Sequence, residues 1–291
     1  MKLLWKATLA LLAGGALFVA CSSRAVTTPP AGAASAPGYY PGKFVWHDLV
    51  TRDPASARRF YGALLGWEFQ DTTRNGRPYA VARVAGRPVA GVVLYPEPTD
   101  DHAAWLSYLS VPDVDQAVEQ VSAAGGQVLY PPADLPGAAR IAVISDPQGA
   151  PLGLARLTGG DPADGPAPSR GHFFWMEYMA ENAEAALEFY RDLSGYESTV
   201  QKGAAGVDYH ILRRDGRSRA GLFQFPKDAD ENVDPNWLPY VRVDDPATLA
   251  GRVEALGGQV LLAPNASIRG GTLAIVADPT GGALALQKWP L

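Results

Sequence analysis

The sequence predicts an α+β protein of four βαβββ modules, which form two tandem domains with curved mixed sheets and the helices outside. The first observation behind this prediction is an internal repeat, in which three ordered motifs recur at offsets of 129, 132 and 132 residues. The recurring pairs are Phe60-Tyr61 with Phe189-Tyr190, Gly125-Gly126 with Gly257-Gly258, and Asp146-Pro147 with Asp278-Pro279. A nearly fixed spacing of this kind is typical of a duplication. The second observation is that each copy contains the order β-α-β-β-β twice.

The first module sets the pattern for the others. An apolar run at 44–50 predicts a strand, and Asp53-Pro54 predicts the N-cap and first turn of a helix. Apolar residues within 57–65 follow a helical spacing, and Gly66 is suited to end that helix. Asn75-Gly76 is a hairpin signal between two of the strands that follow. Those strands are expected at 67–70, 79–84 and 89–95.

The three remaining modules repeat the pattern. Helices are expected after Asp113, over residues 186–193, and from Asp245-Pro246. Strands are expected at 105–111, 127–130, 140–145, 152–157, 173–179 and 238–243. One module exposes a sheet face that it cannot cover alone. Pairing two modules therefore predicts a curved eight-stranded sheet around a concave cleft in each domain.

Composition divides the chain into five parts. We expect a signal peptide at 1–20, a flexible tether at 21–42, a first domain at 43–158, a linker at 159–170 and a second domain at 171–291. The tether is rich in Pro, Ala, Gly and Ser, which cannot bury a core. Either domain is long enough to bury a core of its own.

The N-terminus indicates export. Lys2 and Lys6 precede an apolar run at 7–20, which is shorter than the roughly 20 residues that span a bilayer and favours a cleaved signal peptide. Residues 17–21 resemble a bacterial lipobox, although Phe18 stands where leucine is usual. We therefore expect acylation of Cys21, the only cysteine, and a lipid-anchored protein of the cell envelope at the outer membrane, facing the periplasm. Ordinary secretion is the alternative.

Charge and composition limit the partners. The formal net charge is −5, and no basic stripe with interleaved aromatic residues occurs, so we expect no nucleic-acid partner. The expected partners are a small-molecule ligand and, through Cys21, a membrane.

The motifs Trp46-x-Asp48-Leu49 and Trp175-x-Glu177-Tyr178, with the Phe-Tyr pairs and the Asp-Pro-x-Gly turns, resemble the vicinal oxygen chelate superfamily. That superfamily includes glyoxalase I, extradiol dioxygenases and the fosfomycin- and bleomycin-resistance proteins. The resemblance covers residues 43–289 and implies the paired-module fold. In metal-dependent members it implies ligands on the first and last strands of a module, usually His or Gln and then Glu.

The resemblance assigns those ligand positions to side chains without donor atoms. They are Trp46, Leu106 and Gly153 in the first domain, and Trp175, Leu238 and Ala285 in the second. A catalytic metal needs about three N or O donors that converge. We therefore expect no cofactor and no metal at the family position. The alternative is a divalent metal at an unconventional site, centred on His47 with His102.

The clefts are expected to contain acids and rings. Strand residues alternate between faces, so Asp48 should share the face of Trp46, and Glu177 that of Trp175. A carboxylate beside an indole can act as a general acid or base, which makes Asp48 and Glu177 the catalytic candidates. The alternative is that each acid binds backbone amides or lies at the wet rim. The ligand-binding candidates are Trp46, Tyr108, Trp175 and Tyr240, with core packing as the alternative.

Three functions are compatible with these features. The first is metal-free binding of a small, aromatic or apolar molecule. The second is a lyase-like or dioxygenase-like enzyme that uses a cleft carboxylate or an unconventional metal site. The third is an envelope scaffold whose clefts are vestigial, which predicts an exposed apolar patch.

Overall fold

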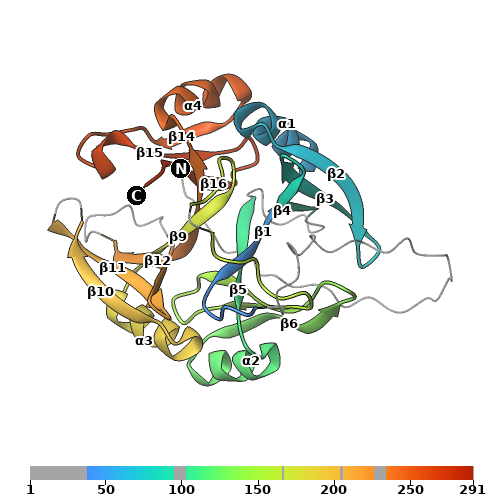
Figure 1. Cartoon of the computed structure of the whole chain (residues 1–291), viewed down its shortest axis with the longest axis vertical. Coiled ribbons are helices and arrows are strands. Elements are labelled where there is room, and N and C mark those ends of the chain that lie inside the picture. Colours follow the sequence, from blue (N-terminus) through green and yellow to red (C-terminus); the bar gives the residue numbers. More distant parts are fainter. Residues whose placement is uncertain (1–37, 95–102, 166, 204–205, 226–233, 291) are drawn as a thin grey trace.

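The computed structural model describes residues 38–94, 103–165, 167–203, 206–225 and 234–290 (Figure 1). The expected signal peptide, Cys21, most of the tether and His102 lie outside the described residues. Within the described ranges, no helix is long and apolar enough to cross a membrane.

The structure confirms four βαβββ modules. The first comprises β1 (Phe44–Thr51), α1 (Pro54–Leu65), β2 (Glu68–Arg74), β3 (Arg77–Val84) and β4 (Arg87–Leu94). The second comprises β5 (Ala104–Ser110), α2 (Val114–Ala123), β6 (Gln127–Leu135), β7 (Ala139–Ser145) and β8 (Pro151–Leu157). The third comprises β9 (Phe173–Ala180), α3 (Ala183–Ser194), β10 (Glu197–Lys202), β11 (Asp208–Arg214) and β12 (Arg217–Gln224). The fourth comprises β13 (Asn236–Val243), α4 (Pro246–Val253), β14 (Gln259–Leu262), β15 (Leu273–Ala277) and β16 (Ala283–Lys288).

Local sequence explains where the helices begin and end. Asp53 caps α1 by accepting the amide of Ser56 at 2.9 Å, and an Asp or Asn occupies the same position before α2, α3 and α4. Gly66 and Gly195 end α1 and α3 in the left-handed region, with φ values of 72° and 63°. The expected Asn75-Gly76 hairpin also forms, since both residues have positive φ.

The modules pair as the repeat predicts. The first sheet has the order β2-β3-β4-β1-β5-β8-β7-β6, and the second has the matching order β10-β11-β12-β9-β13-β16-β15-β14. In each sheet an antiparallel central pair, β1 with β5 or β9 with β13, joins the two modules. Each central strand also runs parallel to the last strand of its own module, so four strands meet at the middle of each sheet.

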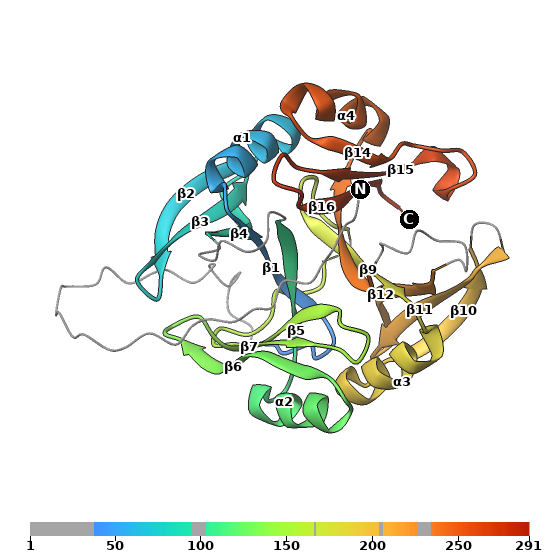
Figure 2. The ribbon, with the colours of Figure 1, turned by 180° about the vertical axis from the view of Figure 1, so that it is seen from behind.

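The halves share their helix-side cores instead of burying one each. Figure 1 shows α1 beside α4 at one end of the molecule and α2 beside α3 at the other, and Figure 2 shows the same pairs from behind. One hydrophobic cluster joins modules one and four, and includes Phe60 on α1 and Val253 on α4. The other joins modules two and three, and includes Val121 on α2 and Phe189 on α3. The faces of the sheets that the helices do not cover hold two separate clusters.

Buried tyrosines tie each half to an Asp-Pro turn of the other. Tyr61 on α1 donates to the Gly282 carbonyl at 3.2 Å. Tyr190 on α3 and Tyr178 on β9 donate to the Asp146 carboxylate at 2.8 Å and 2.5 Å. Burial raises the pKa of the Asp146 carboxyl, and the two tyrosine hydrogen bonds oppose that shift. The repeated Asp-Pro turns are therefore contacts between the halves.

The linker is held by the residues around it. Asp161 accepts from the Tyr40 amide and the Ser110 hydroxyl, both at 2.6 Å. Asp164 forms ion pairs with Lys43 at 2.9 Å and Arg219 at 2.8 Å. The end of the expected tether, residues 38–42, thus contacts the linker and β5.

Candidate functional site

The central strands bring the predicted site residues together on the face of each sheet opposite the helices. In the first sheet Trp46 lies opposite Tyr108 across the β1–β5 pair, and Asp48 is two residues along β1 on the same face. In the second sheet Trp175 lies opposite Tyr240, with Glu177 two residues along β9. We call these faces the inner faces, because each curled sheet bends away from its helices (Figure 1).

The first inner site consists of Trp46, Asp48, Arg74, Tyr79 and Tyr108. Asp48 Oδ1 accepts from Trp46 Nε1 at 2.8 Å and from the Tyr79 hydroxyl at 2.7 Å. Asp48 Oδ2 accepts from Arg74 Nη1 at 2.6 Å. The Asp48 side chain is 1% exposed, so burial without these donors would be costly. Its carboxylate is instead fully hydrogen-bonded and paired.

Arg74 enters this site from the end of β2. A second nitrogen of its guanidinium donates to the Tyr79 hydroxyl at 2.7 Å, and the guanidinium carbon lies 4.0 Å from the centre of the Tyr79 ring. Burial is the largest single effect and lowers the pKa of Arg74, but the charge of Asp48, the oxygens of Tyr79 and Tyr108 and the hydrogen bond to Asp48 together raise that pKa. Burial and the same carboxylate raise the pKa of Tyr108, which keeps this phenol neutral. The site therefore contains one buried anion and one partly exposed cation.

The second inner site consists of Trp175, Glu177, Tyr209, Tyr240 and Arg269. Glu177 Oε1 accepts from Arg269 Nη2 at 2.7 Å, and Glu177 Oε2 accepts from the Tyr240 hydroxyl. The Tyr209 hydroxyl accepts from Arg269 at 3.0 Å and from Trp175 Nε1 at 3.1 Å. Burial raises the pKa of Tyr240, and the charge of Glu177 adds to the shift. The second site thus has the same residue types in a different hydrogen-bond arrangement.

Glycines on the last strands of modules one and three make room for the tyrosines. Gly91 on β4 lies beside Asp48, and a methyl group there would be 1.9 Å from the Tyr79 hydroxyl and 2.1 Å from Asp48 Oδ1. Gly221 on β12 lies beside Glu177, and a methyl group there would be 1.9 Å from the Tyr209 hydroxyl. A tyrosine hydroxyl therefore occupies the space that a side chain at position 91 or 221 would need.

The residues do not fit a catalytic metal at the position that the family resemblance implies. On β8, a methyl group at Gly153 would be 2.3 Å from the Tyr108 ring, so a glutamate cannot enter without displacing that ring. In the second sheet the buried Ala285 lies beside Tyr240. The acid of each site already bonds to an arginine. Among the residues that the structure describes, no three His, Cys, Asp or Glu side chains meet as a metal site would require.

His47 faces away from the first inner site. It lies on the opposite face of β1, where its Nδ1 is 2.8 Å from the Ser107 hydroxyl and its ring stacks on Phe173 of the second half at 4.1 Å. Burial lowers the pKa of His47 to about 3, against a smaller opposing effect of Asp48. His47 is therefore a neutral contact between the halves, and His102, its partner in the alternative metal site, lies outside the described residues.

Sequence reasoning found six of these residues and missed four: Arg74, Tyr79, Tyr209 and Arg269. A signal for the tyrosines exists, because Tyr79 precedes Gly91 by the same twelve residues that separate Tyr209 from Gly221. The arginines carry no such signal. They come from different modules, Arg74 from β2 and Arg269 from a turn before β15.

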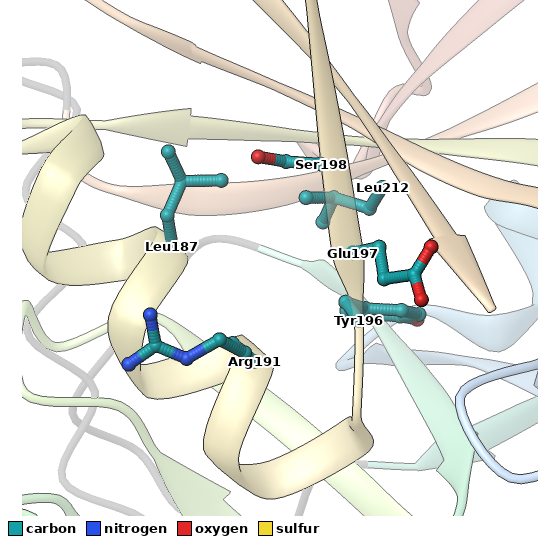
Figure 3. A pocket seen from close by; sticks show the side chains of 6 residues that line it. All are labelled: Leu187, Arg191, Tyr196, Glu197, Ser198 and Leu212. Carbon is teal, nitrogen blue, oxygen red and sulfur yellow. The ribbon is translucent and has the colours of Figure 1, made fainter.

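A separate pocket lies between α3 and β10, on the helix side of the second sheet. It has a volume of about 170 Å³ and is lined by Leu187, Arg191, Tyr196, Glu197, Ser198 and Leu212 (Figure 3). Arg191 is paired with Glu188 and Asp192, and the Tyr196 hydroxyl donates to the Gly42 carbonyl. This pocket shares no residue with either inner site.

Comparison with known proteins identifies the family. Residues 43–154 match the Glyoxalase/Bleomycin resistance protein/Dioxygenase superfamily. The chain is 32% identical over 257 residues to a putative glyoxylase, CFP32, of Mycobacterium bovis, covering 86% of this chain and 96% of the relative. It is 28% identical over 267 residues to the anthracycline biosynthesis protein DnrV of Streptomyces peucetius, covering 86% and 94%. The protein therefore belongs to the glyoxalase/bleomycin resistance protein/dioxygenase superfamily.

Solved structures agree on the fold. The Mn(II)-bound glyoxalase from Novosphingobium aromaticivorans is 15% identical with a TM-score of 0.56, over 86% of this chain and 82% of that one. The 2,2',3-trihydroxybiphenyl 1,2-dioxygenase from Sphingomonas wittichii is 16% identical with a TM-score of 0.55, over 85% and 90%. At this identity the likeness describes the fold alone.

Proposed function

We propose that this protein binds a small aromatic or apolar molecule at one or both inner sites, without a metal. The observation that carries the proposal is the make-up of each site, where a tryptophan and two tyrosines surround one acid whose oxygens already accept hydrogen bonds from protein donors. Aromatic walls with a few fixed polar groups suit recognition of planar molecules. The relative named for anthracycline biosynthesis supports the proposal, since anthracyclines are planar ring systems.

A second candidate is an enzyme in which Asp48 or Glu177 transfers a proton. The recurrence of an acid at the same strand position in both halves favours it, as does the relative described as a putative glyoxylase. Against it, both oxygens of each carboxylate are engaged by donors, and a general base needs a free lone pair directed at the substrate. We therefore place catalysis second.

The scaffold alternative has less support. Its exposed apolar patch would need large apolar side chains in contact with one another. Among the described residues, the exposed ones are dispersed over four strands: Leu94, Val128, Val200 and Leu261. Isolated residues of this kind are ordinary on soluble surfaces.

A thermal-shift screen of the full mature chain tests these proposals. It combines planar aromatic compounds with divalent metals, with and without chelator, and the purified protein is also analysed for bound metal. Binding at 100 times the dissociation constant stabilises a protein by about 2.7 kcal/mol. We expect an aromatic compound to raise the melting temperature and the chelator to leave it unchanged. Stoichiometric metal with a chelator-sensitive melting point would contradict metal-free binding and favour the enzyme.

We also propose that the protein is exported and anchored to the outer membrane through an acylated Cys21. The support is the N-terminal sequence alone. Expression of the full chain in a Gram-negative host with radiolabelled palmitate tests it. We expect the label and membrane fractionation to disappear in Cys21→Ser. A labelled C21S protein, or an unlabelled wild type in the soluble fraction, would contradict the anchor.

A further inference from the structure

We propose that the ligand carries a negatively charged oxygen, a carboxylate or phenolate on the aromatic ring system, and that the guanidinium groups of Arg74 and Arg269 bind it. This inference rests on the proposed function and adds the charge of the ligand.

Burial differs sharply within each ion pair. The Asp48 side chain is 1% exposed while that of Arg74 is 27% exposed, and the corresponding values for Glu177 and Arg269 are 8% and 23%. A molecule that approaches either inner site therefore meets the guanidinium, and the acid lies behind it. The acid orients the cation and does not cover it.

Each guanidinium retains hydrogen-bond donors. A guanidinium has five N–H groups, and Arg74 uses its two terminal nitrogens for Asp48 and Tyr79. Arg269 uses one terminal nitrogen for both Glu177 and Tyr209. These bonds engage fewer than the five N–H groups of either guanidinium. The remaining donors on these partly exposed groups suit a planar carboxylate or phenolate, which arginine binds with fixed geometry.

The surrounding rings hold each arginine in place. Arg74 lies over Tyr79, and Arg269 lies 5.4 Å from the centre of Tyr209 and 5.6 Å from that of Tyr240. Arg269 also has a φ of 48°, which a residue with a side chain rarely adopts. Prepositioned donors reduce the entropy that binding would otherwise cost.

Ligand charge follows from this arrangement. A cationic aromatic compound would meet the partly exposed guanidinium and be repelled, since the carboxylate that balances its charge is more deeply buried. A neutral ring could stack on the half-buried rings of Trp46 or Tyr209 but would leave the remaining donors without an acceptor. An aromatic oxyanion satisfies both the walls and the donors.

The test compares 1-hydroxy-2-naphthoate with its neutral primary amide by isothermal titration calorimetry. The ring system is the same, so a difference in affinity reports on the charge. We expect wild-type protein to bind the acid at least tenfold more tightly than the amide. In the Arg74→Gln and Arg269→Gln double variant, we expect that preference to disappear while the amide still binds.

Matched controls separate local from general effects. Arg83→Gln and Arg213→Gln change half-buried arginines on β3 and β11 of the same two sheets, and we expect the preference to persist in that double variant. Because Arg74→Gln leaves a buried acid without its partner, a second variant adds Asp48→Asn and Glu177→Gln. This variant removes both charges of each pair and is expected to lose the preference as well.

The outcomes distinguish the two proposals. Equal binding of acid and amide by wild type, or an unchanged preference in the arginine variants, would overturn the oxyanion inference and leave aromatic binding intact. Failure of both compounds to bind at millimolar concentration would count against both proposals. Tighter binding by the amide would assign the arginines a purely structural role.

Discussion

The two inner sites have matching residue types on their central strands, but their arginines come from different places. Arg74 lies on the edge strand β2 of the first sheet, whereas Arg269 lies in the turn after the edge strand β14 of the second, which is the opposite edge in the matching strand order. Trp46, Asp48 and Tyr108 correspond to Trp175, Glu177 and Tyr240 in the matching register. Arg74 ends β2, in the module of its acid partner, whereas Arg269 lies in a turn of the module across from Glu177. Register fixes the central strands, because a shift of one residue would turn every side chain to the other face. The sheet edges and turns are not constrained in this way.

The two sites also differ in the hydrogen bonds of their tryptophans and acids. The shorter Asp48 accepts directly from the Trp46 indole, whereas in the other half the Trp175 indole donates to Tyr209. The longer Glu177 reaches the Tyr240 hydroxyl. Because both the acid and the origin of the arginine differ, the two sites are expected to differ in stability and in ligand preference.

Substitution of the buried glycines should have the largest effect on stability. Gly91→Ala forces both the Tyr79 hydroxyl and Asp48 to move, and Gly221→Ala displaces the Tyr209 hydroxyl. We expect losses in the free energy of unfolding of about 3 kcal/mol and about 2 kcal/mol, measured by urea denaturation. Gly251→Ala is the control, because nothing lies within 4 Å of a methyl group at that position. If Gly91→Ala matched the control, the tyrosine network would not occupy that space.

Removal of the arginines is expected to match the glycine substitutions in size. Arg74→Gln leaves the nearly inaccessible Asp48 charge unpaired, with an expected loss of about 3 kcal/mol. Arg269→Gln should cost less, about 2 kcal/mol, because the Glu177 side chain is 8% exposed and therefore more accessible to water than that of Asp48. Adding Asp48→Asn to Arg74→Gln should restore part of the loss in the same denaturation experiment. A larger loss for Arg269→Gln would reverse the comparison.

Much of the fold was predictable from sequence because it is encoded locally. Asp53-Pro54 and Gly66 mark a helix by capping, and Asn75-Gly76 marks a hairpin by its backbone preference. The duplication then extended the assignments for one half to the other. Strand alternation also placed Trp46 with Asp48 on one face. These inferences need only neighbours in sequence.

What was missed depends on distant contacts. The apolar faces of α1 and α2 indicate burial but not the partner, so sequence could not show that the helices pack against the opposite half. Arg74 and Arg269 look like surface arginines until the curled sheet brings them to the acids. The Asp-Pro turns were recognised as repeats, but their contacts with Tyr61 and Tyr190 appear only in three dimensions.

The pH dependence of stability should show a difference between the halves at one matched position. His47 in the first half corresponds to the buried Met176 in the second. Because burial lowers the folded-state pKa of His47 to about 3, the unfolded chain takes up a proton first as pH falls below about 6.5. Stability from this group is therefore present above pH 6.5 and lost toward pH 3.

The measurement compares wild type with His47→Met, which reproduces the second half. Between pH 7 and pH 5, wild type should lose about 2 kcal/mol more unfolding free energy than the variant. Changes due to Asp146 and Asp278 are common to both proteins and cancel in the difference. Parallel stability curves would mean that the imidazole is protonated in the folded protein.

The smallest predicted difference concerns the tyrosines that join the halves. Tyr61→Phe removes a neutral hydrogen bond to Gly282 and the acceptor of Trp105, with an expected loss of about 1 kcal/mol. Tyr190→Phe removes the hydrogen bond to the Asp146 carboxylate and the acceptor of the Trp237 indole. Because hydrogen bonds to charged groups are stronger, we expect a larger loss in the free energy of unfolding, about 1.5 kcal/mol. Tyr178 still donates to Asp146, which limits the second loss. Thermal unfolding of both variants checks which loss is larger. Tyr39→Phe is the control, because Tyr39 is less buried than Tyr61 or Tyr190. A larger loss in Tyr61→Phe would mean that the Gly282 turn, and not the Asp146 carboxylate, is the stronger connection between the halves.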